Sequence, residues 1–324
     1  MDGLVEYKAI KTMEKNIEMT YKKLGNSTLN ISRISFGCMS LKSDQENFDA
    51  VIGKAINNGI NFFDTADLYD YGANEECLGK TLKQNRKQLI IATKVGNKWR
   101  PDRNSFDWNP TKKYILTAAE ESLKRLQTDY IDLYQLHGGT IEDDIDDTID
   151  AFETLIRQGK IRYYGISSIR PNVIREYVKR SNIISVMMQY SLLDRRPEET
   201  CLKLLMDNNI GVLARGSLAS GLLVGKEAKP YLGYDEKTIK DAASAIAMIT
   251  REDSNLAVTA INFVLENPAI TSAVAGIRNS NQLINILQFI NSAPLSFSDI
   301  EMLKMAIPSE QYKIHRGLFL IKRR

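Results

Sequence analysis

The sequence predicts an α/β fold, a closed (β/α)8 TIM barrel of parallel strands, on three observations. Eight short apolar runs alternate with longer helical patterns between about residue 30 and residue 290 of the 324-residue chain, and eight such units close a barrel. The runs are mostly continuously apolar, as is typical of strands buried on both faces. No two glycines are separated by a single residue. The G-x-G-x-x-G fingerprint of the main alternative, an open doubly wound sheet that binds a dinucleotide, is therefore absent.

The elements follow one another in a regular order. Residues 23–29 have the composition of a hairpin turn between two short strands, and we place this hairpin under the barrel floor as its closure. The eight barrel strands are expected at Ile31–Met39, Asn61–Ala66, Leu89–Val95, Tyr130–His137, Arg162–Ser168, Ser185–Tyr190, Gly211–Leu218 and Ser272–Ile277. Helices are expected at Asp44–Asn58, Asn109–Leu126, Ile141–Gln158, Pro171–Lys179, Pro197–Asn208, Thr238–Thr250, Ser254–Glu266 and Asn279–Asn291.

Local signals support the helix boundaries. Gly59 and Gly159 each follow a helical pattern, where glycine commonly ends a helix. Pro110 stands at an early helical position, where its missing N–H costs nothing. The connection from Ala219 to about Thr271 is longer than one helix requires. We expect a poorly ordered N-terminal extension at 1–19, a barrel domain at 20–315 and a basic C-terminal tail at 316–324.

Composition excludes several classes of function. The 43 Lys and Arg against 40 Asp and Glu leave a net charge of only +3, too little for a nucleic-acid binder. No apolar run approaches the ~20 residues that a membrane helix needs, and the acidic residues within positions 1–20 do not suit a signal peptide. Three scattered cysteines and two histidines are too few for a zinc cluster. We expect reduced thiols, a cytoplasmic location, no membrane and no metal.

Four polar side chains stand at the ends of three neighbouring strands. Asp64 and Tyr69 follow the second strand, Lys94 ends the third, and His137 ends the fourth. In a barrel these ends point into one shared mouth. Taken singly, Asp64 could be a cap, Tyr69 a packing residue and His137 a structural histidine, whereas a lysine after an apolar strand is costly unless paired. Together they indicate a catalytic site.

The motifs around these residues resemble the aldo-keto reductase family, in its bacterial branch of general oxidoreductases. The segments are 61–69 (NFFDTADLY) with 74–79 (NEECLG), Lys94 within Ala92-Thr93-Lys94, and 130–137 (YIDLYQLH). The similarity extends from about Thr20 to His315. It implies a barrel that binds NADP(H), in preference to NADH, and reduces an aldehyde or ketone to the alcohol.

The resemblance also assigns catalytic roles. Tyr69 would act as general acid, with Lys94 lowering the pKa of its phenol. Asp64 would hold Lys94, and His137 would orient the substrate carbonyl. Tyr71 is the competing phenol, and spacing from the later motif residues places it at the pocket rim instead. Further pocket walls are expected from Met39, Trp99 and Trp108.

The remaining strand ends are expected to bind the cofactor. Ser167 and Ser168 match the family's nicotinamide carboxamide contacts, although Ser168 replaces an Asn. The position of the family's glutamine falls on Met187. Gln189 lies on the same face of the strand and could take the place of that glutamine. Arg215 could stack on the nicotinamide. The expected pyrophosphate-covering loop contains Gly216, Ser217, Leu218 and Gly221. The expected 2′-phosphate site contains Gly276, Arg278 and Gln282.

Three other functions are alternatives to a reductase. A P-loop at 221–226 lacks one residue between its glycines and the following Ser or Thr. A regulatory subunit of the same fold, with bound cofactor but little turnover, is the principal alternative. A metal-dependent hydrolase using Asp64, Asp67 and Glu75 conflicts with Lys94 beside those carboxylates. Neither the physiological substrate nor the oligomeric state follows from the sequence.

Overall fold

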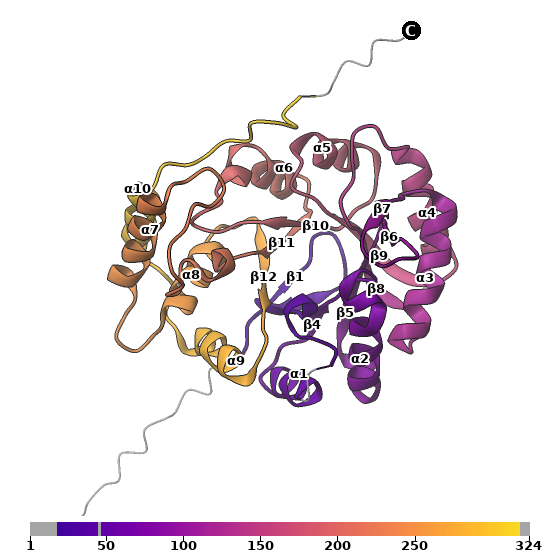
Figure 1. Cartoon of the computed structure of the whole chain (residues 1–324), viewed down its shortest axis with the longest axis horizontal. Coiled ribbons are helices and arrows are strands. Elements are labelled where there is room, and N and C mark those ends of the chain that lie inside the picture. The colour runs from indigo at the N-terminus through magenta and orange to yellow at the C-terminus, as the bar shows by residue number, and fades with distance from the viewer. Residues whose placement is uncertain (1–17, 45–46, 318–324) are drawn as a thin grey trace, which may run out of the picture.

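The computed structural model describes residues 18–44 and 47–317, and these form a closed eight-stranded parallel barrel surrounded by helices (Figure 1). The barrel strands are β3 (Ile34–Gly37), β4 (Phe62–Asp64), β5 (Ile90–Val95), β8 (Ile131–Leu136), β9 (Ile161–Ser167), β10 (Ser185–Gln189), β11 (Gly211–Arg215) and β12 (Ile270–Gly276). They pair in this chain order, and β12 closes the ring against β3. The predicted barrel is confirmed. The expectations for residues 1–17 and 318–324 lie outside the described residues.

Among residues 18–44 and 47–317, the helix layer contains the predicted helices and two more. The helices are α1 (Phe48–Asn57), α2 (Ala73–Leu82), α3 (Lys112–Leu126), α4 (Ile145–Arg157), α5 (Pro171–Arg180), α6 (Cys201–Asp207), α7 (Glu236–Ile249), α8 (Leu256–Leu265), α9 (Ser280–Leu287) and α10 (Phe297–Ala306). The sequence did not predict α2 or α10. On α2 the buried face includes the polar Asn74 and Glu75, and on α10 Phe297 and Met305 are exposed. Neither helix therefore shows a clear apolar stripe.

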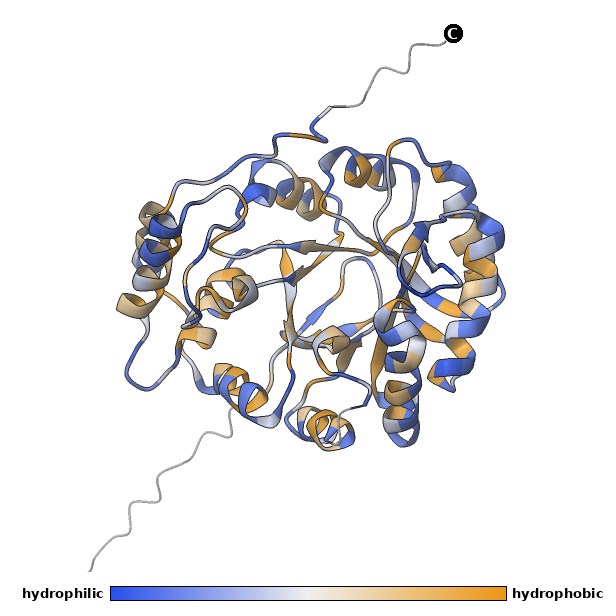
Figure 2. Ribbon diagram, in the orientation of Figure 1, coloured by the Kyte–Doolittle hydropathy of each residue, from blue (hydrophilic) through white to orange (hydrophobic). Residues whose placement is uncertain are grey.

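Two hydrophobic cores hold these layers together. The larger fills the space between the strands and the helices, and the smaller lies inside the barrel around Phe62, Leu133 and Leu213. Figure 2 shows the largely hydrophobic strands and the mixed surface of the surrounding helices. No helix of the described residues has the length and apolar character to cross a lipid bilayer.

A hairpin closes the barrel floor, as predicted. Strands β1 (Tyr21–Lys23) and β2 (Asn30–Ser32) are antiparallel, and Leu24, Leu29 and Ile31 belong to the core inside the barrel. Gly25 has a φ of +51°, and a Cβ there would lie 2.2 Å from the carbonyl oxygen of Ile184. The tight approach of the hairpin to the strand starts therefore depends on glycine at this position.

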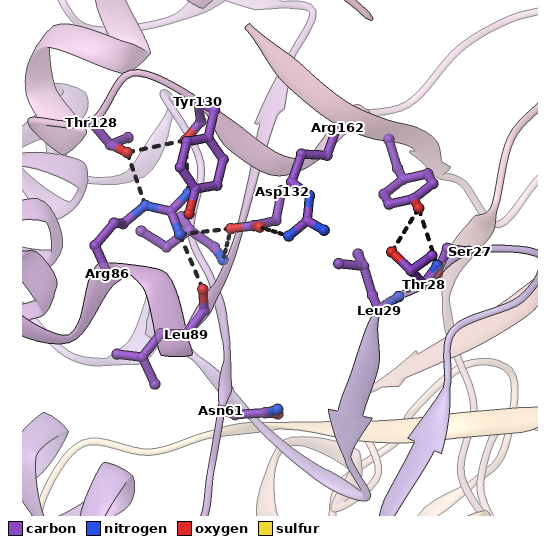
Figure 3. A network of polar contacts seen from close by, with 12 residues as sticks. Ser27, Thr28, Leu29, Asn61, Arg86, Leu89, Thr128, Tyr130, Asp132 and Arg162 are labelled. Atoms are coloured by element: carbon purple, nitrogen blue, oxygen red, sulfur yellow. Dashed lines mark hydrogen bonds and ion pairs between the residues drawn. The ribbon is translucent and has the colours of Figure 1, made fainter. Parts of the chain in front are cut away.

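A buried ion-pair network lies near the same floor (Figure 3). The Asp132 side chain is 1% exposed and lies 2.8 Å from Arg86 and 3.0 Å from Arg162. It also accepts a hydrogen bond from the backbone N–H of Ile91 on the neighbouring strand. Both carboxylate oxygens thus have charged or backbone partners, which a buried carboxylate requires. The network joins the starts of β5 and β8, at the opposite end of these strands from Lys94 and His137.

Candidate active site

Lys94 is the centre of a buried polar cluster at the mouth of the barrel. Its Nζ donates to Asp64 Oδ2 at 2.6 Å, to the carbonyl oxygen of Thr65 at 2.7 Å and to the hydroxyl of Tyr69 at 3.1 Å. The Lys94 side chain is only 1% exposed. Burial lowers the pKa of this ammonium, but Asp64 and Tyr69 outweigh burial, so the pKa lies above its usual value. Lys94 is therefore a fixed cation at neutral pH.

Asp64 holds the cation from the end of β4. Its second oxygen, Oδ1, accepts a hydrogen bond of 3.2 Å from Gln135 Nε2. Burial raises the pKa of Asp64, and Lys94 opposes that rise. Gln135 was not singled out in the sequence, although strand alternation places it on the same face as His137. The carboxylate thus has a partner on both oxygens.

Tyr69 presents its hydroxyl to Lys94 from the turn after β4. Burial raises the pKa of its phenol above the ordinary value, while Lys94 lowers it. Lys94 thus lowers the phenol pKa, as the sequence predicted, but desolvation is the larger effect and the net pKa lies above the ordinary value. Tyr69 is fully protonated at neutral pH, which is the form that a proton donor needs.

His137 lies directly beside the phenol. The two rings meet edge to face with centroids 6.0 Å apart. Burial, together with the positive charges of Lys94 and Arg215, lowers the pKa of His137 to about 3. Its Nδ1 is buried without a hydrogen-bond partner among the described residues. The ring is therefore neutral and keeps polar capacity for a bound group.

The expected pocket residues divide into a rim and a support. The rings of Tyr71 and Trp99 pack at a tilt of 46° with centroids 4.5 Å apart, and the Trp99 indole donates to the Leu68 carbonyl at 3.2 Å. Met39 is 62% exposed on the loop after β3. The indole of Trp108 instead donates to Asp143 at 2.9 Å.

Trp99 and Trp108 belong to an unpredicted hairpin beyond β5. Its strands are β6 (Asn97–Trp99) and β7 (Phe106–Trp108). The ring of Trp108 packs against Gly96 and Gly138, where added Cβ atoms would lie 2.6 and 3.3 Å from it. Asn97 Nδ2 donates to the backbone carbonyl of His137 at 3.0 Å. The hairpin therefore supports the segment that carries His137, a contact that sequence patterns could not show.

The expected nicotinamide residues line the β9–β11 side of the mouth. Gln189 and Arg215 are register partners, and Arg215 Nη1 donates to Gln189 Oε1 at 3.2 Å. Met187 is in the core inside the barrel, so Gln189 is the residue of this strand at the mouth. Ser167 ends β9, and Ser168 Oγ accepts from the backbone N–H of Arg170 at 3.2 Å.

The loop after β11 has a backbone of unusual curvature. Gly216 and Gly221 have φ values of +74° and +96°, and Ala219 and Ser220 between them are also left-handed. Ser217 Oγ is buried and has no partner among the residues described, and Leu218 packs against the outer core. Lys226, in the segment where the P-loop pattern fails, donates to the carbonyl of Ser220 at 2.8 Å. This loop thus combines an unpartnered hydroxyl with a nearby cation.

The expected phosphate site lies at the start of α9. Gly276 ends β12, and the backbone N–H of Arg278 donates to Gln282 Oε1 at 3.0 Å. Asn279 caps the helix by accepting from the N–H of Gln282 at 2.9 Å. A helix N-terminus beside an arginine suits a phosphate dianion.

These observations test whether the residues fit a nicotinamide dinucleotide. His137 Nδ1 and Ser217 Oγ are buried without a partner among the described residues, and cationic side chains lie at or after strand ends, at Arg215 of β11, at Lys226 after β11 and at Arg278 before α9. Polar atoms for a carboxamide, a curved backbone for a pyrophosphate and a cationic helix start for a further phosphate are all present, and the residues fit the cofactor.

Comparison with known proteins identifies the family. A model of the aldo/keto reductase family matches residues 33–307. The uncharacterized oxidoreductase YqkF of Bacillus subtilis is 46% identical over 308 residues, covering 92% of this chain and 100% of the relative. The aldo-keto reductase yakc (NADP(+)) of Schizosaccharomyces pombe is 36% identical over 219 residues, 64% of each chain.

A solved structure agrees with these matches. The holo form of the aldo-keto reductase AKR11C1 from Bacillus halodurans has a TM-score of 0.87 to this chain at 44% identity, covering 93% of this chain and 100% of its own. The sequence motifs, the closed barrel and the relatives lead to the same family. The resemblance seen in the sequence is confirmed, and this chain belongs to the aldo/keto reductase family of oxidoreductases.

Proposed function

We propose that the protein is an NADP(H)-dependent reductase that converts an aldehyde or ketone to its alcohol. The observation that carries this proposal is the hydroxyl of Tyr69 at 3.1 Å from the ammonium of Lys94, which Asp64 holds at 2.6 Å. A phenol beside a buried cation, with a neutral imidazole next to it, is a proton donor for an oxygen that gains negative charge.

The residues divide the work of the reduction. When bound, the cofactor supplies the hydride that reaches the carbonyl carbon. Tyr69 donates its proton to the carbonyl oxygen, and Lys94 stabilises the phenolate that remains. The neutral His137 ring hydrogen-bonds the carbonyl oxygen and orients it. Asp64 keeps Lys94 charged and in place, so both reacting partners meet a preorganised site.

The cofactor contacts follow from the same arrangement. Ser167, Ser168 and Gln189 would hold the carboxamide, and Arg215 would lie against the nicotinamide. The pyrophosphate would be held by the loop of Gly216, Ser217, Leu218 and Gly221. Gly276, Arg278 and Gln282 would hold the 2′-phosphate of NADP(H), a choice supported by the NADP(+) in the name of the Schizosaccharomyces pombe relative.

A substitution at Arg278 tests the cofactor preference. The change Arg278→Leu should raise the Kd for NADPH about 10- to 100-fold, because a charge-assisted hydrogen bond to a phosphate contributes roughly 1.5–3 kcal/mol. The Kd for NADH, which lacks the 2′-phosphate, should change less than about twofold. Fluorescence titration of both nucleotides provides the measurement. Equal weakening of the two would remove Arg278 from the 2′-phosphate site.

The substrate side of the mouth is aromatic and apolar. Met39, Tyr71 and Trp99 would contact the substrate, with Trp108 supporting the wall behind them. Met39 and Tyr71 are 62% and 50% exposed, so they present apolar surface to a ligand. A flat aromatic aldehyde suits this wall better than a charged sugar phosphate.

The direct test is an assay for turnover. Purified protein is mixed with NADPH and a reactive aromatic aldehyde such as 4-nitrobenzaldehyde, and the loss of nicotinamide absorbance is followed, with aldehyde omitted as the control. Steady oxidation of NADPH that forms the alcohol supports the proposal. Tight NADPH binding without turnover over a broad carbonyl panel would favour the regulatory subunit instead.

The pH dependence of this activity tests the state of His137. Its pKa of about 3 lies below the usual value near 6.5, so the ring stays neutral from pH 8 down to about pH 4. We expect kcat for reduction to show no limb near pH 6.5. A limb there that disappears in His137→Asn would contradict a neutral histidine. Stability should fall as pH drops below 6.5, because only the unfolded chain then binds this proton.

The proposal includes the cellular location of the protein. Cys38, Cys77 and Cys201 are free thiols, which suits a reducing compartment, and we place the protein in the cytoplasm with a small-molecule carbonyl compound as its partner. The metal-dependent alternative is disfavoured because Asp64 and Glu75 are each paired with a cationic side chain, Lys94 and Arg125.

A further inference from the structure

We propose that Glu75, paired with Arg125, is a positioning residue that fixes the distance between Lys94 Nζ and the Tyr69 hydroxyl. This inference rests on the proposed reduction and adds residues that act on it from outside the mouth. Glu75 touches neither of the two groups. It acts through Thr93 on one side and, by way of Arg125, through Gly72 on the other.

The first link holds the strand that carries Lys94. Thr93 points outward from β5, and its hydroxyl donates to Glu75 Oε1 at 2.6 Å. Both side chains are fully buried. Because Thr93 immediately precedes Lys94, this bond fixes the end of the strand from the face opposite the mouth.

The second link holds the turn that carries Tyr69. Arg125 of α3 donates from Nε to the other oxygen, Glu75 Oε2, at 2.7 Å. The same guanidinium lies against Gly72, where an added Cβ would be 2.7 Å from Arg125 Cδ. Gly72 ends the turn that begins at Tyr69, and its φ of +89° requires glycine. The ion pair therefore contacts both elements: Arg125 packs against the turn at Gly72, and Glu75 bonds to Thr93 of β5.

A neighbouring residue adds a third connection from the same helix turn. Asn74 is fully buried, accepts from the Thr65 hydroxyl at 2.7 Å and donates to the Leu41 carbonyl at 2.9 Å. The carbonyl of Thr65 is itself an acceptor for Lys94. The first turn of α2 thus bonds to Thr93, the neighbour of Lys94 in the chain, and to Thr65, the neighbour of Asp64.

The charges around Glu75 explain why a carboxylate is placed here. Asp67 lies close by, and burial and the charge of Glu75 raise its pKa well above the usual range. Arg125 forms its ion pair with Glu75, at 2.7 Å between Arg125 Nε and Glu75 Oε2. Glu75 is fully buried, and a buried carboxylate left without its arginine would be costly, so the pair is held in one geometry.

Substitutions at Thr93 test the first link gently. Thr93→Val keeps the shape and removes the hydroxyl, whereas Thr93→Ser keeps the hydroxyl. We expect Thr93→Val to lower kcat about tenfold, with the KM for the carbonyl and the Kd for NADPH within about twofold of the wild type. Thr93→Ser should restore kcat to within about twofold. A purely structural role would not split kcat from KM in this way.

Glu75→Gln tests both links, to Thr93 and to Arg125, together. It should lower kcat at least as much as Thr93→Val, and the double variant should lose no more than the larger single loss, because coupled residues are not additive. Asp132→Asn is the matched control: it breaks a buried ion pair of the same kind near the floor (Figure 3). It should lower Tm by at least about 2 °C and leave kcat unchanged.

A structural measurement separates this inference from the proposed function. Crystal structures of the wild type and of Thr93→Val and Glu75→Gln should show the Lys94 Nζ–Tyr69 Oη separation grow beyond hydrogen-bond distance in the variants. An unchanged separation overturns the positioning role, whether or not the wild type reduces carbonyl compounds. Wild-type turnover together with unchanged kcat in Thr93→Val and Glu75→Gln overturns it as well, and leaves the reductase proposal intact.

Discussion

Replacing Tyr69 by phenylalanine is expected to lower kcat for carbonyl reduction by about 10²- to 10⁴-fold, the range that a positioned general acid contributes. The change removes the one phenolic hydroxyl that Lys94 contacts at 3.1 Å. The ring stays, so its edge-to-face contact with His137, at 6.0 Å between centroids, is retained. Stability should therefore change little while the proton donor is lost.

The measurement is NADPH oxidation at saturating aldehyde, with the Kd for NADPH determined in parallel. The Kd should stay within about twofold, because the hydroxyl acts on the substrate oxygen. Tyr163→Phe is a suitable control, since its hydroxyl bonds to Thr28 on the floor hairpin, far from the mouth. Equal turnover in wild type and Tyr69→Phe would assign proton donation to another group.

Replacing Lys94 by methionine is expected to lower kcat by about 10²- to 10³-fold, the effect of removing one stabilising donor from a preorganised site. It should also lower the free energy of unfolding by about 3–5 kcal/mol, because Asp64 is left buried without its partner. One substitution is thus expected to reduce both kcat and the free energy of unfolding, for different physical reasons.

The double variant Asp64→Asn/Lys94→Met separates them. Asparagine keeps an acceptor for Gln135, which donates to Asp64 at 3.2 Å, and removes the unpaired charge. Urea unfolding should recover much of the lost stability, while kcat stays as low as in Lys94→Met. Recovery of activity along with stability would show that Lys94 serves the fold alone.

The barrel could be predicted because its strands are buried on both faces. Runs such as 89–95 and 130–137 are mostly apolar, and a polar residue near the carboxyl end of such a strand is expected in the mouth. Because the carboxyl ends of barrel strands share one mouth, the sequence predicted that Asp64, Lys94 and His137 lie in one site. The structure places their side chains at the predicted ends of β4, β5 and β8.

Other elements could not be predicted for equally physical reasons. Helix α2 buries Asn74 and Glu75 toward the strands, so its pattern does not look amphipathic. The β6–β7 hairpin has three residues in each strand, too few for an alternation to be recognised. Trp108 was expected at the pocket wall, and only the packing against Gly96 and Gly138 shows that it also supports His137.

The amino-acid sequence alone predicted the class of fold from its periodicity and the family from the resemblance of its motifs. Strand-end position predicted that Asp64, Tyr69, Lys94 and His137 lie together, because it is a local property of the chain. The tertiary structure decided the direction in which their pKa values shift and which side chains support them. Burial raises the pKa of Tyr69 and lowers that of His137 to about 3. Desolvation and charge depend on neighbours that are distant along the chain, such as Lys94 and Arg215, and these meet only when the barrel closes.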